Sequence, residues 1–230
     1  MYSLGIFLFQ KAENAEEGIK IIDLLYKDGS FGDLLGLAIV GILFILSFMA
    51  LYIFIERYLT INKAGRIDET FLNNIKNSVA SGNLEGAKAV CRNTDSPYSR
   101  MVEKGIQRIG KPLRDINASI ENVGNLEVFK LEKNLSTLAS IAGVAPMIGF
   151  FGTVTGMILA FYKMSSEDNV TPTVLAGGIY QALFTTAGGL FVGILAFVGY
   201  NLLVANVDKV VFKMERTATE FMDMLQEPMK

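Results

Sequence analysis

The residues of this chain that could do chemistry inside a membrane carry hydroxyl and amide groups rather than charges. They stand in two long apolar runs, residues 140–162 and 180–203. Threonine hydroxyls and a glutamine amide can hold water and share hydrogen bonds, but they cannot store a proton near neutral pH. We expect this polar strip to face a protein partner or a hydrated path. Its candidate residues are Thr153, Gln181, Thr185 and Thr186.

Glycines accompany these polar residues at helical spacing. Gly152 and Gly156 are four residues apart, as are Gly189 and Gly193, so each pair shares one stripe of a helix. Small residues allow membrane helices to approach closely. We therefore expect helix packing at Gly149, Gly152, Gly156, Gly189 and Gly193. Spacing alone leaves open the alternative that the threonines also serve only to pack helices.

The composition excludes several kinds of site. The chain has no His, and Cys91 is its only cysteine, so an intrachain disulfide and a Cys/His zinc site cannot form. The segment GFFGTVTG at residues 149–156 lacks the lysine of a phosphate-binding loop and follows no expected strand. Neither apolar run contains Asp, Glu, Lys or Arg. We predict no metal, no cofactor and no enzymatic activity, and any proton carried here needs a carboxylate from another chain.

The elements that hold these residues are expected to be membrane-spanning helices. The chain has 230 residues, of which 51% are hydrophobic, and a mean hydropathy of +0.37. Residues 34–55 form a third charge-free run, and roughly 20 apolar residues suffice to cross a bilayer as a helix. The expected fold class is an all-α membrane protein with three transmembrane helices. The second and third extend into the cytoplasm as long helices, beside a small helical cytoplasmic segment.

The distribution of basic residues predicts the topology. Residues 56–134 hold 13 Lys and Arg, whereas the segments expected on the opposite side hold few. The positive-inside rule then places the middle segment and the C-terminus in the cytoplasm. The expected division begins with an amphipathic N-terminal helix on the outer side (1–30), for which a frayed soluble tail is the alternative. It continues with transmembrane helices at 31–56, 135–162 and 176–206, a cytoplasmic helical segment at 57–134, an outer loop at 163–175 and a cytoplasmic C-terminal helix at 207–230.

The second and third spans are expected to continue beyond the membrane. From Pro112 onward no strong stop signal precedes the membrane, and the apolar residues of 128–138 keep a spacing of three or four. This pattern predicts one continuous helix. Pro146 would bend it at the membrane entrance, since proline removes a backbone donor and clashes with the preceding turn. An apolar stripe over residues 210–225 predicts a matching extension of the third span.

Two motifs resemble those of a known family. Residues 145–161, APMIGFFGTVTGMILAF, resemble the second-span motif of the MotA/TolQ/ExbB proton-channel family, and residues 177–201 resemble its third-span motif. Residues 81–91, SGNLEGAKAVC, are similar to the helical cytoplasmic segment of ExbB and TolQ proteins. Three spans and this length favour the ExbB/TolQ branch over the MotA branch, whose members usually have four spans.

The resemblance implies a function and a set of partners. It implies a homo-oligomer, a pentameric ring in the inner membrane of Gram-negative bacteria, with the N-terminus in the periplasm. A dimer of ExbD/TolR-like single-span helices would occupy the pore and carry the proton on a membrane Asp. Force would pass to a TonB-like or TolA-like protein to energise outer-membrane transport. A TolQ-like role in envelope maintenance and a passive membrane scaffold are the alternatives; a self-contained channel or small-solute carrier is a weaker one. Lipid is expected as a partner, and nucleic acid is not.

The resemblance also assigns roles to single residues. Thr153 in GTVTG and Thr186 in TTAGGL match the pore-lining threonines of the family. Family members often have Glu in the GIxEAL part of the third span, where this chain has Gln181 in GIYQAL. That departure places the whole titration on the Asp of the partner.

Overall fold

A computed structural model of the chain describes residues 30–66, 69–166 and 172–226, and all the regular elements in these ranges are α-helices. The chain divides into two compact units. The first is Met1–Ser47 with Gly143–Gly193, and the second is Phe48–Ala142 with Ile194–Lys230. The expected all-α fold class is confirmed. The expected amphipathic helix at 1–30 lies, except for its last residue, outside the described part.

Three of the helices are long and apolar enough to cross a membrane. They are α2 (Ser30–Ala64), α7 (Leu135–Ser166) and α8 (Pro172–Gln226). The last runs through 55 residues without interruption, far beyond the roughly 20 that a bilayer needs. The expected continuation of the third span as a long helix is therefore confirmed. The protein is a multi-pass membrane protein.

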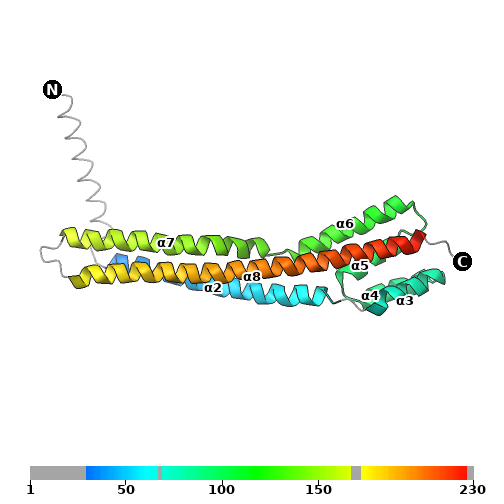
Figure 1. The fold of residues 1–230 in the computed structure, drawn as a ribbon, viewed down its shortest axis with the longest axis horizontal. Helices are drawn as coiled ribbons and strands as arrows, with labels where there is room; N and C mark the ends of the chain where they lie inside the picture. Colours follow the sequence, from blue (N-terminus) through cyan, green and yellow to red (C-terminus); the bar gives the residue numbers. More distant parts are fainter. Residues whose placement is uncertain (1–29, 67–68, 167–171, 227–230) are drawn as a thin grey trace, which may run out of the picture. The chain divides into compact units, whose positions relative to one another are not determined.

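The first unit consists of the apolar parts of these three helices. Within it, α7 and α8 lie side by side and α2 packs beside α8, as Figure 1 shows for the left part of the ribbon. Its buried positions are mainly small or aliphatic, including Ile39 and Leu43 of α2, Ala145 of α7 and Ala182 of α8. Where the buried residue is small, as at Ala145 of α7 and Ala182 of α8, the two helices can approach closely.

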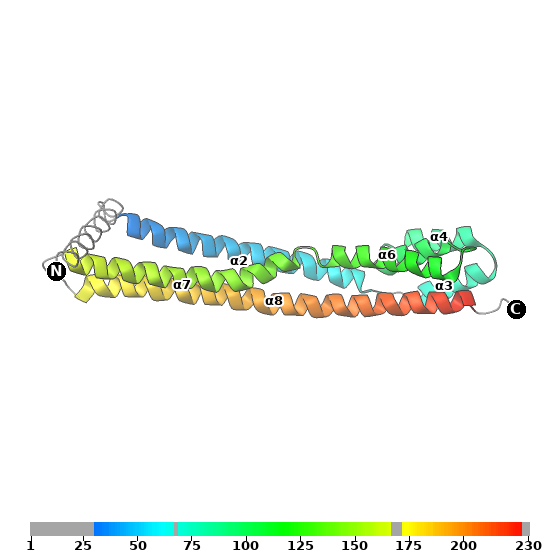
Figure 2. The same cartoon turned by 90° about the horizontal axis from the view of Figure 1, so that it is seen from above.

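The second unit contains four shorter helices: α3 (Glu69–Ala80), α4 (Leu84–Asn93), α5 (Pro97–Ile106) and α6 (Leu113–Leu131). They gather beside the C-terminal part of α8 (Figure 2). The side chain of Asn83 caps α4 by accepting from the amide of Gly86, and Ser96 and Ser99 form a capping box around Pro97 at the start of α5.

The second unit differs from the sequence-based expectation at one point. The expected continuous helix from Pro112 into the membrane is wrong, because α6 ends at Leu131 and α7 begins at Leu135. Asn134 has a φ of 63°, a left-handed conformation that asparagine adopts more readily than most residues. The apolar spacing continues across this break since Leu131, Leu135 and Leu138 are all buried, so periodicity alone could not reveal it.

A buried arginine stabilises the same break. Arg57 of α2 is only 6% exposed, and its Nη1 donates a hydrogen bond of 3.0 Å to the carbonyl of Lys130. Its guanidinium also pairs with Glu56. A cation is favourable at a helix C-terminus, where backbone carbonyls lack partners. Further along α7, Pro146 lies within the helix, which continues on both sides, and the expected bend remains a prediction.

Candidate functional site

The candidate site is built on a glycine seam between α7 and α8. A β-carbon added to Gly189 would lie 2.6 Å from the carbonyl oxygen of Ala145 and 2.8 Å from the Cα of Gly149. One added to Gly149 would lie 2.8 Å from the carbonyl oxygen of Thr185. Backbone thus contacts backbone here, and a larger residue would force the helices apart.

The seam continues on both sides of this closest approach. A β-carbon on Gly152 would lie 2.4 Å from the hydroxyl oxygen of Thr185, and one on Gly156 would lie 3.1 Å from the β-carbon of Ala182. Thr185 is 1% exposed, and its hydroxyl donates to the carbonyl of Ala182 at 2.8 Å. The structure therefore places Thr185 inside the seam. Gly193 is also buried.

The two threonines singled out by sequence meet at the edge of this seam. The hydroxyls of Thr153 on α7 and Thr186 on α8 lie in hydrogen-bond contact. The Thr186 hydroxyl also lies 3.0 Å from the carbonyl oxygen of Gly149, and the Thr153 hydroxyl lies 3.4 Å from the same oxygen. The shorter distance assigns the Thr186 hydroxyl as the donor to the Gly149 carbonyl. The Thr153 hydroxyl then donates to the oxygen of Thr186. Both protons are then used, and the pair presents free lone pairs as acceptors.

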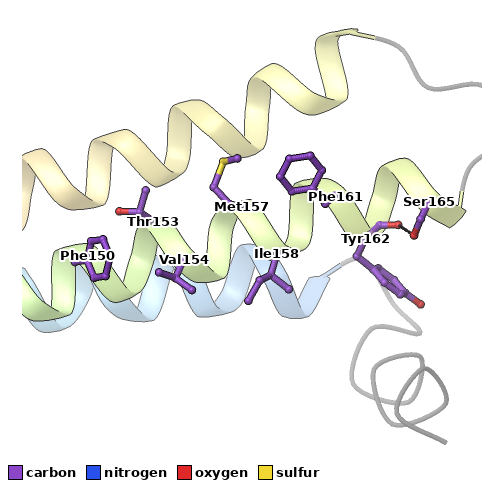
Figure 3. Close-up of a pocket in the computed structure, with 8 residues that line it drawn as sticks. All are labelled: Phe150, Thr153, Val154, Met157, Ile158, Phe161, Tyr162 and Ser165. Carbon is purple, nitrogen blue, oxygen red and sulfur yellow. Dashed lines mark hydrogen bonds between the residues drawn. The ribbon is translucent and has the colours of Figure 1, made fainter. Parts of the chain in front are cut away.

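Thr153 opens onto a long groove of about 650 Å³ on α7. Figure 3 shows its eight lining side chains, all carried by this one helix. The apolar ones include Phe150, Val154, Ile158 and Phe161. Of the described residues along the groove, Thr153 is the one that the sequence predicted as a site residue. Thr186 reaches it through the hydroxyl contact with Thr153.

Gln181 lies at a different seam of the first unit. A β-carbon added to Gly36 of α2 would lie 1.5 Å from Nε2 of Gln181, so the glycine leaves room for the end of that side chain. Gln181 is partly exposed, and its place in a proton path remains a prediction. Sequence reasoning missed Gly36, because it lies far from Gln181 in the chain. It also missed Gly178, whose added β-carbon would lie 2.7 Å from that of Ala160.

The site therefore offers hydrogen-bond acceptors in apolar surroundings, without a charge of its own. Among the described residues, no three metal-ligating side chains cluster. The hydroxyl pair can accept a proton-bearing group, such as a water or a protonated carboxylic acid, but it cannot titrate. This chemistry fits one half of a proton path whose other half holds an ionisable group.

Comparison with known sequences gives a consistent assignment. The sequence model of the MotA/TolQ/ExbB proton channel family matches residues 93–216, more than half of the chain and all four candidate polar residues. The Tol-Pal system protein TolQ of Haemophilus influenzae is 42% identical over 86 residues, which are 37% of this chain and 38% of that protein.

Two further relatives carry the ExbB name. Biopolymer transport protein exbB1 of Vibrio cholerae is 35% identical over 89 residues, covering 38% of this chain and 39% of the relative. Biopolymer transport protein ExbB of Neisseria gonorrhoeae is 29% identical over 134 residues, covering 52% of this chain and 61% of the relative. The alignments thus span less than two thirds of these relatives.

Proposed function

Because this chain belongs to the MotA/TolQ/ExbB proton channel family, we propose that it is an ExbB-like, ring-forming subunit of a proton-driven motor. The motor uses the proton motive force across the bacterial inner membrane to energise TonB-dependent outer-membrane transport. The chain itself supplies helices, hydroxyls and a groove, and performs no enzymatic reaction.

One observation carries the proposal: the hydroxyl pair of Thr153 and Thr186 at a groove that is otherwise mostly apolar. Hydroxyls that accept hydrogen bonds stabilise a protonated carboxylic acid beside them, since the acid has an O–H to donate. The charge-free spans offer no acid of their own. The proton carrier therefore comes from a second chain.

The partner that fits is an ExbD/TolR-like protein with a single membrane helix and an intramembrane Asp. Its helix occupies the centre of a ring of copies of this chain, a pentamer by resemblance, so that each groove in turn meets the carboxylate. Force then leaves the ring through a TonB-like protein. The Lys and Arg distribution supports an N-terminus in the periplasm and a C-terminus in the cytoplasm.

Two other functions remain as competitors. The 42% identity to a TolQ protein favours a motor of the same kind that serves envelope maintenance. Purification with a TolR-like and TolA-like set, in place of an ExbD-like and TonB-like set, distinguishes it. The backbone contact at Gly149 and Gly189 suits a passive scaffold equally well. Proton flux separates a scaffold from either motor.

The deciding experiment is proton flux in vesicles that contain this chain and its co-purified single-span partner. We expect Thr153→Val and Thr186→Val each to abolish the flux while the ring still assembles, because valine keeps the shape of threonine but removes the acceptor. Flux is followed with a pH-sensitive dye under an imposed potential, and assembly by gel filtration.

Thr155→Val is the matched control. The Thr155 hydroxyl contacts carbonyls of its own helix, those of Phe151 and Gly152, and lies outside the described lining of the groove. This variant should conduct as the parent does. Full flux in both the Thr153 and Thr186 variants would remove the basis for a hydroxyl-lined path, and a complex without flux in the parent would favour the scaffold.

A further inference from the structure

A second concave site lies in the other unit, between the end of α2 and the middle of α8. It is a groove of about 200 Å³, smaller than the roughly 300–1,000 Å³ of sites for drug-sized ligands. Its polar lining gathers three cations and two amides, with a tyrosine at one side. These residues are Arg66, Lys209, Lys213, Asn62, Asn206 and Tyr58.

None of the three cations has a carboxylate partner among the described residues. Lys63, one turn before Arg66, pairs with Asp95 at 3.0 Å, and several other basic residues of this unit are also paired. Within the described residues, Arg66, Lys209 and Lys213 make no ion pair. Three positive charges therefore converge on one small groove uncompensated, which favours an anionic ligand.

The backbone that carries Arg66 is fixed from two sides. Nζ of Lys213 donates to the carbonyl of Gly65 at 2.9 Å. The hydroxyl of Tyr98, a side chain 1% exposed, lies 2.8 Å from the carbonyl oxygen of Ala64 and also contacts that of Arg66. Lys213 keeps two of its three N–H groups for a ligand. The site is thus partly organised before any ligand binds.

The groove lies where the apolar surfaces of both helices end. On its apolar side the rings of Phe54 and Tyr58 stack with centroids 6.0 Å apart, and a β-carbon on Gly199 of α8 would lie 3.0 Å from the Phe54 ring. Tyrosine is typical of the membrane–water interface. Large apolar side chains are exposed just beyond, including Ile55, Leu59 and Leu202. A ligand in this groove has water on one side and acyl chains on the other.

We propose that this groove binds the phosphate group of an anionic phospholipid in the cytoplasmic leaflet. Lys209 and Lys213 neutralise the phosphate, Arg66 donates to its oxygens, and the two asparagines donate to the headgroup. The acyl chains lie along the exposed apolar faces of α2 and α8. The inference rests on the membrane location of the chain and on its proposed orientation, and not on its proposed part in a motor.

The test measures lipid retained by the purified full-length protein. The protein is exchanged into nanodiscs of phosphatidylcholine with a minor share of phosphatidylglycerol, and the enrichment of phosphatidylglycerol around it is measured by mass spectrometry. We expect enrichment in the parent. Lys209→Gln should weaken it about fivefold, and Lys209→Gln with Arg66→Gln further, since each cation near a membrane surface contributes about one such factor.

Lys133→Gln is the matched control, because Lys133 is exposed and does not line the groove. Its positive charge interacts electrostatically with Glu56, which lies at the end of the apolar part of α2. The enrichment of phosphatidylglycerol around the Lys133→Gln variant should equal that around the parent. The proposal is overturned if Lys133→Gln lowers the enrichment of phosphatidylglycerol as much as Lys209→Gln does, or if Lys209→Gln does not lower it. Within the described part of the chain, the side chains of Lys209 and Arg66 donate no hydrogen bond that would hold the fold. Circular dichroism checks that both variants stay helical.

A second experiment distinguishes a bound lipid from a bound soluble anion. Inorganic phosphate is added to discs of pure phosphatidylcholine, and thermal stabilisation of the protein is measured. If inorganic phosphate stabilises the parent and the Lys209→Gln variant equally, the result supports the lipid as the ligand. Stabilisation that Lys209→Gln abolishes, without enrichment of phosphatidylglycerol, overturns the lipid and assigns the groove to a soluble phosphate.

Discussion

Cys91 shows how burial controls the chemistry of a single side chain. It is 2% exposed within the second unit, and burial together with the negative charge of Glu103 raises the pKa of its thiol to about 12. The reactive form of cysteine is the thiolate. At neutral pH this thiol is almost entirely protonated as well as shielded.

Native Cys91 should therefore not react with a maleimide between pH 7 and pH 8, and should react fully once the protein is unfolded in detergent. Mass spectrometry after timed labelling gives the rate. A Lys111→Cys variant is the positive control, because Lys111 is exposed in the turn between α5 and α6. Native labelling of Cys91 as fast as that of the control would contradict the buried position.

At the scale of the element, the sequence predicted the long helices well and their joints less well. Charge-free runs and a 3–4 apolar spacing are local signals, and they placed α2, α7 and the extension of α8. The break after α6 depends on one left-handed residue, Asn134, and on the distant guanidinium of Arg57. Likewise the glycine spacing predicted a packing stripe, whereas the room that Gly36 leaves for Gln181 requires knowledge of which helices are neighbours.

The glycine seam gives a prediction with a neighbouring control. Gly189→Ala should destabilise the pairing of α7 and α8 by about 1–3 kcal/mol, the usual cost of overpacking, because the added carbon would meet backbone atoms of Ala145 and Gly149. Gly188→Ala should be tolerated, since its nearest neighbour would be a side-chain carbon of Leu43 at 3.8 Å. Thermal unfolding in detergent compares the two, and equal effects would argue against backbone contact.

At the scale of the whole molecule, the Lys and Arg pattern predicts which ends of the membrane helices face the cytoplasm. The segment between α2 and α7, residues 65–134, carries 11 basic residues, while residues 167–171 between α7 and α8 carry none, and Lys163 lies in the last turn of α7. The positive-inside rule then predicts that the segment between α2 and α7 lies in the cytoplasm.

This topology predicts the labelling of two single-cysteine variants in cells. A maleimide that cannot cross the inner membrane should label Ser165→Cys in intact cells and Lys111→Cys only after permeabilisation. Both positions are exposed, and the shielded thiol of Cys91 contributes no background. Labelling of Lys111→Cys before permeabilisation would reverse the orientation.

The contrast between a one-piece α8 and a jointed α6–α7 has a mechanical consequence. Backbone hydrogen bonds continue through the 55 residues of α8, so the helix resists local twisting along its length. The turn at residues 132–134 interrupts the ladder between α6 and α7, so backbone hydrogen bonds do not join these two helices into one rod. Of the two, α8 keeps an unbroken backbone ladder, whereas the end of α6 is held by the hydrogen bond that Arg57 donates to the carbonyl of Lys130.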